Sequence, residues 1–381
     1  MPVLSFRTIR LVLFAVLLGS TAEVQAQPIH QHPTPTDPLQ ERWAWAQEHA
    51  ERDDHRAGYW VGYQIQRKMR ARSWIGSWNR DGQNRPTLAE QLGRSTDPGL
   101  EPQRRSLAEV AREALSEYDE EQAQPEDALV ERDVALLFLY DQRGRLDEVK
   151  VSNLDLRVDL EKRPLWWLGQ AERSASLALV DGLFQNAPAG QREDLTSTVA
   201  LHGGDAPGVG PWLTRVIEDR GEDLDVREQA VFWLGETNAE GALPFLEALA
   251  LSDEPQNLRE EAVFAIHLPK TPASTEALIR LTKSSQDPDV REQAIFWLGQ
   301  TASEQAAAAL RDVVDDGGDV ELQKQAVFAL SELPNNEGIP PLMDVARTHP
   351  RLEVRKQAIF WLGQSDDPRA LDLLIELARN R

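Results

Sequence analysis

The chain contains no cysteine among its 381 residues. This absence excludes disulfide bonds, thiolate catalysis and a lipid anchor on cysteine, so the stability of the fold must come from packing. Long apolar runs are missing too. The run 11–18 is too short to cross a bilayer, and no later segment approaches the roughly 20 apolar residues that a membrane helix needs. We therefore expect no insertion into a membrane.

Positive charge is scarce as well. The chain has 41 Lys and Arg residues against 63 Asp and Glu residues, which gives a formal net charge of −22. A strongly negative protein is repelled by nucleic acid and by anionic lipid. We therefore expect no nucleic acid as a partner and predict that the partner is a protein or peptide, with basic partners favoured.

The N-terminal segment has the pattern of an export signal. Arg7 and Arg10 precede the apolar run, and a stretch of small residues follows it and ends at Ala26. This order is typical of a secretory signal peptide cleaved after Ala26. The sequence thus predicts a signal peptide over residues 1–26 and a periplasmic or secreted protein.

The next segment, residues 27–40, has the composition of a linker. It holds four prolines together with His30 and His32. Such a composition predicts a mobile connection in which both histidines are solvated.

A ten-residue block recurs from residue 226 onward with a period of 32 residues. Every copy keeps Ala at the fifth position and Phe at the seventh. Second amphipathic segments lie between the copies, so each unit is predicted to be two antiparallel helices. One such pair cannot bury its apolar face alone, whereas stacked pairs bury it together. The copies begin at Val226, Leu258, Val290, Leu322 and Val354.

Weaker copies precede these five. Residues 165–170 (Leu-Trp-Trp-Leu-Gly-Gln) repeat the end of the block, residues 199–202 are similar to 264–267, and a further degenerate copy is predicted around residues 134–139. We therefore predict a solenoid of about 7 to 8 repeats, with atypical terminal units, over residues 106–381.

The starts of three copies resemble a known family. Residues 225–227, 289–291 and 353–355 read Asp-Val-Arg, Asp-Val-Arg and Glu-Val-Arg, as in the second helix of HEAT repeats. The short period is similar to the compact HEAT-like repeats of phycobilin lyases and deoxyhypusine hydroxylase. The resemblance implies an all-α, right-handed α-solenoid of helix pairs. It also implies that the arginine bonds an acidic side chain of a neighbouring repeat, a series that Gln323 interrupts.

Residues 41–105 have a different pattern. A short helix is predicted over 41–52, and the alternation of apolar and other residues from Tyr59 to Gln66 is typical of a strand. A second apolar patch follows at 74–78. These features predict a small N-terminal element, a helix plus a β-hairpin, docked on the first repeats.

The segment 56–80 is basic and aromatic. It carries six Lys or Arg residues and no acid, interleaved with tyrosine and tryptophan. We expect an intramolecular contact of this segment with the acidic solenoid. An anionic glycan, an envelope surface or a partner protein are the alternatives.

Projection of the block onto a helix assigns its columns to faces. The first, fifth, eighth and ninth positions cluster on one apolar side, which predicts the core. The eighth position alternates between tryptophan and alanine, and close packing favours a structural role for the tryptophans, with an exposed binding ladder as the alternative. This column is Trp233, Ala265, Trp297, Ala329 and Trp361.

The seventh position points away from that core although it is always phenylalanine. These rings either pack against adjacent helices or form a stripe for binding on the concave face. Amides at the fourth position flank the stripe, and the third position changes from acidic to basic along the chain. The candidate binding residues are Phe232, Phe264, Phe296, Phe328 and Phe360, with Gln229, Gln293, Gln325 and Gln357 and the charged Glu292 and Lys324.

The sequence carries no recognisable motif for catalysis. The chain has no nucleophile elbow and no phosphate loop. None of the seven histidines is followed by Glu, whereas deoxyhypusine hydroxylase binds iron through His-Glu pairs. We therefore expect a non-catalytic interaction scaffold without a metal or cofactor. A HEAT-like lyase or oxidoreductase, or an enzyme accessory, is one alternative, and an envelope-sensing component acting with a membrane-bound regulator is another.

Overall fold

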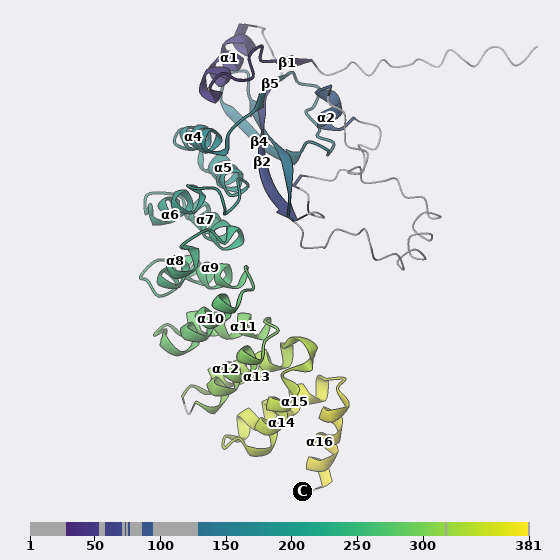
Figure 1. Ribbon diagram of the computed structural model, residues 1–381. Coiled ribbons are helices and arrows are strands. Elements are labelled where there is room, and N and C mark those ends of the chain that lie inside the picture. The colour runs from purple at the N-terminus through teal and green to yellow at the C-terminus, as the bar shows by residue number, and fades with distance from the viewer. Residues whose placement is uncertain are drawn as a thin grey trace, which may run out of the picture.

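The computed structural model describes residues 28–52, 58–70, 73, 75–76, 86–93, 129–316 and 318–379. A sheet with covering helices lies at one end, and a curved stack of helix pairs extends from it (Figure 1). The predicted signal peptide lies outside the described residues. None of the helices within the described ranges has the length and apolarity that are needed to cross a membrane.

Five strands form a mixed sheet in the order β1-β5-β2-β3-β4. The strand β2 runs parallel to β5 at one edge and antiparallel to β3 along the other, and β3 also pairs antiparallel with β4. A strand over residues 59–66 is thus confirmed. The patch at 74–78, from which we expected the second strand of the hairpin, lies mostly outside the described residues, and β2 pairs with β3 and β5. The strands are β1 (Ile29–Gln31), β2 (Tyr59–Arg70), β3 (Leu129–Tyr140), β4 (Leu146–Asn153) and β5 (Leu165–Gln170).

Two segments that we predicted as repeat helices belong to this sheet. Residues 165–170 form β5, and residues 134–139 lie within β3. Both segments are short apolar runs buried in the middle of the sheet, and periodicity alone does not separate such a run from a buried helix. The predicted start of the solenoid at residue 106 is therefore wrong, and the first helix of the stack begins at Arg173.

The predicted linker 27–40 is wrong as well. β1 lies inside it and pairs with β5. The His30 ring stacks on Trp166 with ring centroids 4.2 Å apart, and the His32 ring meets Trp45 edge-on at 4.7 Å. Both histidines are half-buried, so pairing and ring stacking hold a segment that its prolines had indicated to be mobile.

Both faces of the sheet are covered. The predicted helix over 41–52 is present as α1 (Leu39–Arg52), and its Trp43 packs against Tyr63 and Phe138 on one face. On the opposite face, Trp60 packs in a second cluster with Leu88 of the short helix α2 (Leu88–Gln91). β2 is therefore buried on both sides, which its alternating sequence did not indicate.

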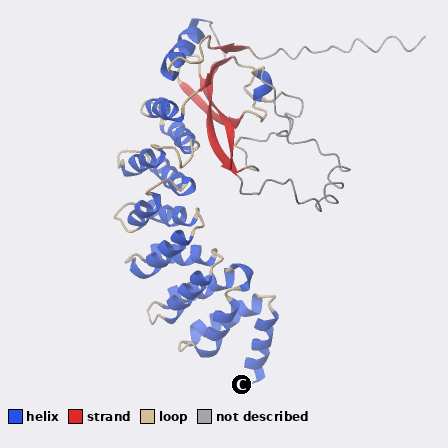
Figure 2. Ribbon diagram, in the orientation of Figure 1, coloured by secondary structure: helices blue, strands red, loops and turns tan. Residues whose placement is uncertain are grey.

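The rest of the chain is an α-solenoid, as predicted. Six helix pairs and a final helix α16 follow one another within the described residues, and each pair stacks on the next (Figure 2). This number is below the 7 to 8 repeats that we predicted, because the two most upstream copies belong to the sheet. The helices are α4 (Arg173–Phe184), α5 (Ala189–Ala200), α6 (Val209–Glu218), α7 (Leu224–Thr237), α8 (Ala242–Ala250), α9 (Gln256–His267), α10 (Pro272–Ser284), α11 (Pro288–Gly299), α12 (Glu304–Asp315), α13 (Val320–Glu332), α14 (Ile339–Thr348), α15 (Leu352–Gln364) and α16 (Pro368–Arg379).

The arginines at the second block position join neighbouring elements. Arg227 pairs with Glu254 at 2.6 Å, and Arg259 pairs with Asp287, so the interaction implied by the HEAT resemblance is present in two repeats. Arg291 instead donates to the carbonyl oxygen of Thr282. Gln323, which replaces the arginine, donates to the carbonyl oxygens of Val314 and Asp316. The glutamine thus still joins its helix to the end of the preceding helix.

Candidate functional site

The candidate site is the inner face of the solenoid, formed by the recurring-block helices α7, α9, α11, α13 and α15. These helices line the concave side of the arc, and α4 to α14 with even numbers line the convex side (Figure 1). The sheet lies beside this inner layer at one end and α16 lies beside it at the other (Figure 2). Both ends of the inner face are therefore bounded by other elements.

The phenylalanine column reaches the surface of this face. None of its five rings is buried: Phe232, Phe264 and Phe328 are half-buried, while Phe296 is 41% exposed and Phe360 is 53% exposed. Features of both alternatives from the sequence are present. The half-buried Phe264 and Phe328 pack against the tryptophan of the next block helix, whereas Phe296 and Phe360 are exposed. Together with the tryptophans of the eighth position, the five rings form what we call the aromatic stripe.

The tryptophans lie at the border between core and surface, so their predicted burial in the core is wrong. Trp233, Trp297 and Trp361 are each half-buried and pack against the core from its edge. The Trp297 ring is 4.7 Å from Phe264, and Trp361 is 5.0 Å from Phe328. Each of these two indoles contacts the phenylalanine of the preceding block helix. The eighth position of that helix is alanine, and close packing favours a large side chain next to a small one.

A hydroxyl anchors the first tryptophan. Ser197 Oγ accepts hydrogen bonds from Trp233 Nε1 at 3.0 Å and from Gln229 Nε2 at 2.8 Å. Ser197 was not predicted from the sequence, although its spacing of 36 residues from Trp233 recurs between Glu261 and Trp297 and between Gln325 and Trp361. The hydrogen bond does not recur at these later positions. Within the described residues, Trp297 Nε1, Trp361 Nε1 and Gln325 Oε1 are buried without a hydrogen-bond partner.

The charged column differs from the expected acid-to-base gradient. Glu292 and Lys356 are exposed. Lys324 pairs with Glu321 at 2.9 Å, which raises the pKa of the lysine and neutralises it locally. Glu228 of this column is half-buried, as is Glu261 of the adjacent fourth position, and burial raises the pKa of both carboxyl groups. The column therefore changes in burial as well as in the sign of its charge between α7 and α15.

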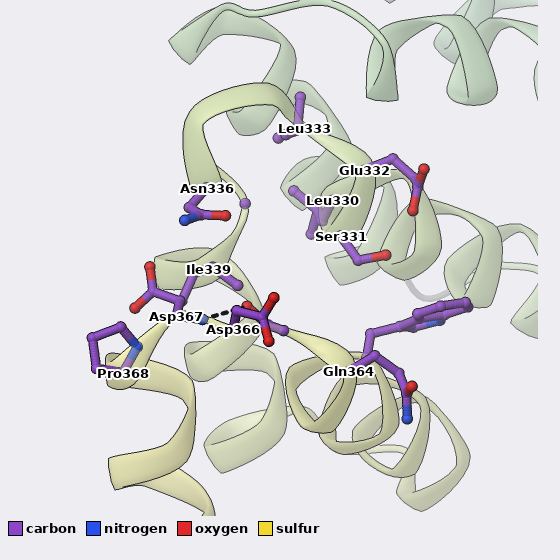
Figure 3. Close-up of a pocket in the computed structure, with 13 residues that line it drawn as sticks. Leu330, Ser331, Glu332, Leu333, Asn336, Ile339, Gln364, Asp366, Asp367 and Pro368 are labelled. Carbon is purple, nitrogen blue, oxygen red and sulfur yellow. Dashed lines mark hydrogen bonds between the residues drawn. The ribbon is translucent and has the colours of Figure 1, made fainter.

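A cavity of about 360 Å³ lies at the far end of the inner face. It is located between the end of α13 with the following 3-10 turn, η2 (Pro334–Asn336), and the junction of α15 with α16 (Figure 3). Leu330, Leu333 and Ile339 supply apolar walls, and Trp361 joins the cavity to the aromatic stripe. The sequence did not predict this cavity, because it depends on how two repeat ends meet.

The basic segment 56–80 contacts the first repeats where it is described. Arg67 donates to the carbonyl oxygen of Leu201 at 2.7 Å. The negative charge of the nearby Asp205 favours the charged form of Arg67 and so partly offsets the lowering of its pKa by burial. Lys68, which is exposed, also acts on Asp205. The expected intramolecular contact is therefore present for Arg67. Residues 56, 72, 74, 78 and 80, which belong to the same prediction, lie outside the described residues.

No cluster of three or more metal-ligating side chains occurs in the described part of the chain. The buried Ser176 and His202, which lie 2.7 Å apart, face the Tyr63 hydroxyl at the junction of sheet and solenoid. All three side chains are fully buried, so the group links the two parts of the fold and offers no access to a substrate.

The family model of HEAT repeats matches residues 248–321 and 316–381. Residues 248–381 are HEAT repeats. The HEAT repeats include α9, α11, α13 and α15, and hence four of the five helices that carry the aromatic stripe. No curated protein matches the chain.

Three solved structures are similar to parts of the chain. Human deoxyhypusine hydroxylase in complex with glycerol is 20% identical, with 54% of this chain and 78% of that chain covered and a TM-score of 0.25. The complex of CpcE and CpcF of phycocyanin lyase from Nostoc sp. PCC7120 is 22% identical over 45% and 71%, with a TM-score of 0.31. Kap95p, in a structure with RanGDP, is 14% identical over 58% and 29%, with a TM-score of 0.33.

Proposed function

We propose that this chain is an exported, non-catalytic scaffold that binds a protein or peptide on the inner face of its HEAT repeats. The observation that carries the proposal is the aromatic stripe, in which large rings recur once per repeat and are exposed on one face. A stack of helix pairs provides a continuous concave surface for such an interaction.

The exposure of Phe296 and Phe360 is the strongest support. Both rings project from inner helices with 41% and 53% of their surface open to solvent. An amphipathic helix of this type normally carries polar residues at such positions, and exposed apolar rows with polar borders are typical of interaction surfaces. The amides Gln293 and Gln357 are half-buried beside the rings and supply hydrogen-bonding groups at that border.

Export rests on the sequence of residues 1–26, with its basic start, apolar run and small-residue end. The absence of cysteine removes any dependence on disulfide formation in an oxidising compartment. We expect the exported chain to begin at Gln27. Fractionation of expressing cells, followed by N-terminal sequencing of the purified chain, tests this, and recovery of the intact Met1 form from the cytoplasm would contradict it.

Site-specific photo-cross-linking tests the binding face. A benzophenone amino acid at position 296 or 360 is expected to form a covalent product with the same partner in a cell-envelope fraction. Position 251 serves as the matched control, because Leu251 is 48% exposed but lies at the end of the convex-side helix α8.

A double variant gives the complementary result. Phe296→Ser with Phe360→Ser should lower the yield of the product formed from a benzophenone at position 264, while the free energy of unfolding changes by only about 1 kcal/mol, as for most exposed positions. Products from position 251 that equal those from 296 and 360, or unchanged binding by the double variant, would exclude the inner face as the binding surface.

A further inference from the structure

One repeat departs from the amide column of the inner face. The fourth block position is glutamine in four copies, whereas the copy in α9 has Glu261. Glu261 is half-buried, and within the described residues no hydrogen bond or ion pair joins it to another side chain. A carboxylate that is partly removed from water and left without a partner costs free energy.

A second carboxylate lies beside it. Glu228, on the preceding inner helix α7, is near enough for its charge to raise the pKa of Glu261 further, after burial as the main cause. Glu228 Oε1 is itself buried without a hydrogen-bond partner, although the Asn257 side chain interacts with the same carboxyl group. Two acceptors on adjacent helices therefore share a small region of the inner face, and among the described residues no cationic side chain acts on either carboxyl group.

Aromatic rings border these acceptors. Phe264 follows Glu261 by three residues, so both project from the same side of α9. The Phe264 ring is 6.2 Å from Phe232 and 4.7 Å from Trp297. All three rings are half-buried and thus keep part of their surface open to the inner face. Acidic groups and ring surfaces in one place match the chemistry of a cationic side chain.

We propose that Glu261, together with Glu228 and Phe264, receives an arginine side chain of the bound partner. A guanidinium is planar, carries five N–H donors and stacks on aromatic rings, so one arginine can bond both carboxylates while lying on a ring. A lysine ammonium satisfies the charge but not the stacking. The net charge of −22 favours the approach of such a partner. This inference rests on the proposed function, because the arginine must come from a chain on the inner face.

Selection of peptides is the experiment. Random short peptides displayed on phage are selected on the purified full chain, and synthetic copies of the enriched peptides are measured by calorimetry. We expect one arginine to recur in them, and we expect its replacement by the neutral isostere citrulline to weaken binding about tenfold or more, as for the loss of a charge-assisted hydrogen bond. Replacement by lysine should weaken binding less than citrulline does.

Matched variants of the chain isolate the site. Glu261→Gln introduces the residue that the other copies already carry, so the fold is expected to persist, and it should weaken the arginine peptides about tenfold. Glu276→Gln removes the same charge from an exposed position on the convex-side helix α10 and should change binding less than about twofold, because exposed charges contribute little.

The outcomes separate this inference from the proposed function. Peptides that bind wild type, lose affinity in the Phe296→Ser and Phe360→Ser variant, but show no arginine preference or no loss with Glu261→Gln would overturn the arginine site and leave the binding face intact. Enriched peptides in which only lysine recurs would overturn it likewise. A selection that enriches the same peptides on wild type and on the phenylalanine variant would overturn both.

Discussion

A Cβ atom added to Gly299 would lie 2.9 Å from the Cα and the Cβ atoms of Ala329. The inner helices α11 and α13 therefore approach closely at this pair. Gly235 meets Ala265 in the same way, where an added Cβ atom would lie 2.8 Å from the alanine Cα atom, so α7 and α9 form a second close contact. Glycine of a tryptophan-bearing helix thus packs on the alanine of the helix that follows.

The junctions between these close pairs are filled differently. From α9 to α11 the indole of Trp297 lies over Phe264 and stacks on His267 with centroids 4.8 Å apart. Trp361 lies over Phe328 at the corresponding junction of α13 and α15. The alternation of tryptophan and alanine in the sequence therefore reflects an alternation of junctions, in which every second one has an aromatic spacer.

Gly299→Ala should destabilise the protein although alanine favours helices. The added methyl group has no room against Ala329, and overpacking of this kind costs about 1 to 3 kcal/mol. Gly363→Ala is the matched control, since its added Cβ atom would meet only a Leu374 side-chain carbon at 4.0 Å, and the higher helix propensity of alanine should leave stability unchanged or raise it by up to about 1 kcal/mol. Urea denaturation measures both, and equal effects would contradict the close contact.

Trp297→Ala tests the spacer. Truncation removes the contacts with Phe264 and His267 and opens a gap between α9 and α11, but the indole is half-buried, so we expect a cost of about 2 kcal/mol, below the 3 to 5 kcal/mol of a fully buried tryptophan. Leu298→Ala, at the neighbouring and fully buried position, should cost about 3 to 5 kcal/mol. Thermal unfolding measures the stability of both variants. A loss of stability for Trp297→Ala that equals or exceeds that of Leu298→Ala would show that Trp297 belongs to the core.

The solenoid was predictable because five copies of the block keep one period without an insertion. Such regularity fixes the helix pairs and the faces of each helix, and it correctly placed Phe296 and Phe360 away from the core. The predicted burial of Trp297 was wrong because a projection treats one helix alone, whereas the indole packs on Phe264 and His267 of the neighbouring helix. Contacts of this kind depend on the distance between helices, which varies from junction to junction.

The sheet could not be predicted in the same way. β2 pairs with β3, which begins almost 60 residues later than β2 ends, and no local pattern indicates pairing over such a separation. Both faces of β2 are buried, so Gln64, an apparently polar-face residue, is also in the interior. The sequence of residues 165–170 is similar to the end of the repeat block, and this similarity favoured a helix. In the structure the segment is a strand that pairs with β1 and β2.

We expect the purified protein to contain no stoichiometric metal and to be insensitive to chelators. The physical reason is the lack of a ligand cluster among the described residues and the lack of cysteine in the whole chain. Elemental analysis after purification without chelator, with melting curves recorded before and after EDTA, checks this. About one iron or zinc ion per chain, with a lower melting temperature after its removal, would favour the alternative of an enzyme.

The junction of sheet and solenoid should make stability depend on pH. Burial lowers the pKa of His202 to about 4, and the nearby positive charges of Arg67 and Arg173 act in the same direction. Its Nδ1 atom lies 2.9 Å from the Thr198 carbonyl oxygen and must donate, so Nε2 is the acceptor for the Ser176 hydroxyl at 2.7 Å. A proton on Nε2 would break this arrangement.

The direction of the pH dependence follows from the different pKa values of His202 in the unfolded and the folded protein. The unfolded histidine takes up a proton near pH 6.5, whereas the folded one resists protonation down to about pH 4. Stability is therefore lost as the pH falls between these values, by roughly 3 kcal/mol in total. Asp194, Glu228 and Glu261 act in the opposite direction, because burial raises their pKa values and the folded state then takes up protons more readily than the unfolded state.

His202→Gln isolates the contribution of the histidine from that of the carboxyl groups. Glutamine can keep a hydrogen bond to Ser176 but does not titrate, so the free energy of unfolding of the variant should fall less steeply between pH 6.5 and pH 4 than that of wild type. The difference between the two curves, measured by urea denaturation at a series of pH values, should reach roughly 3 kcal/mol at the acidic end. Parallel curves over this range would mean that His202 is already charged in the folded protein, and the hydrogen-bond chain from Tyr63 through Ser176 would then have to run in the reverse direction.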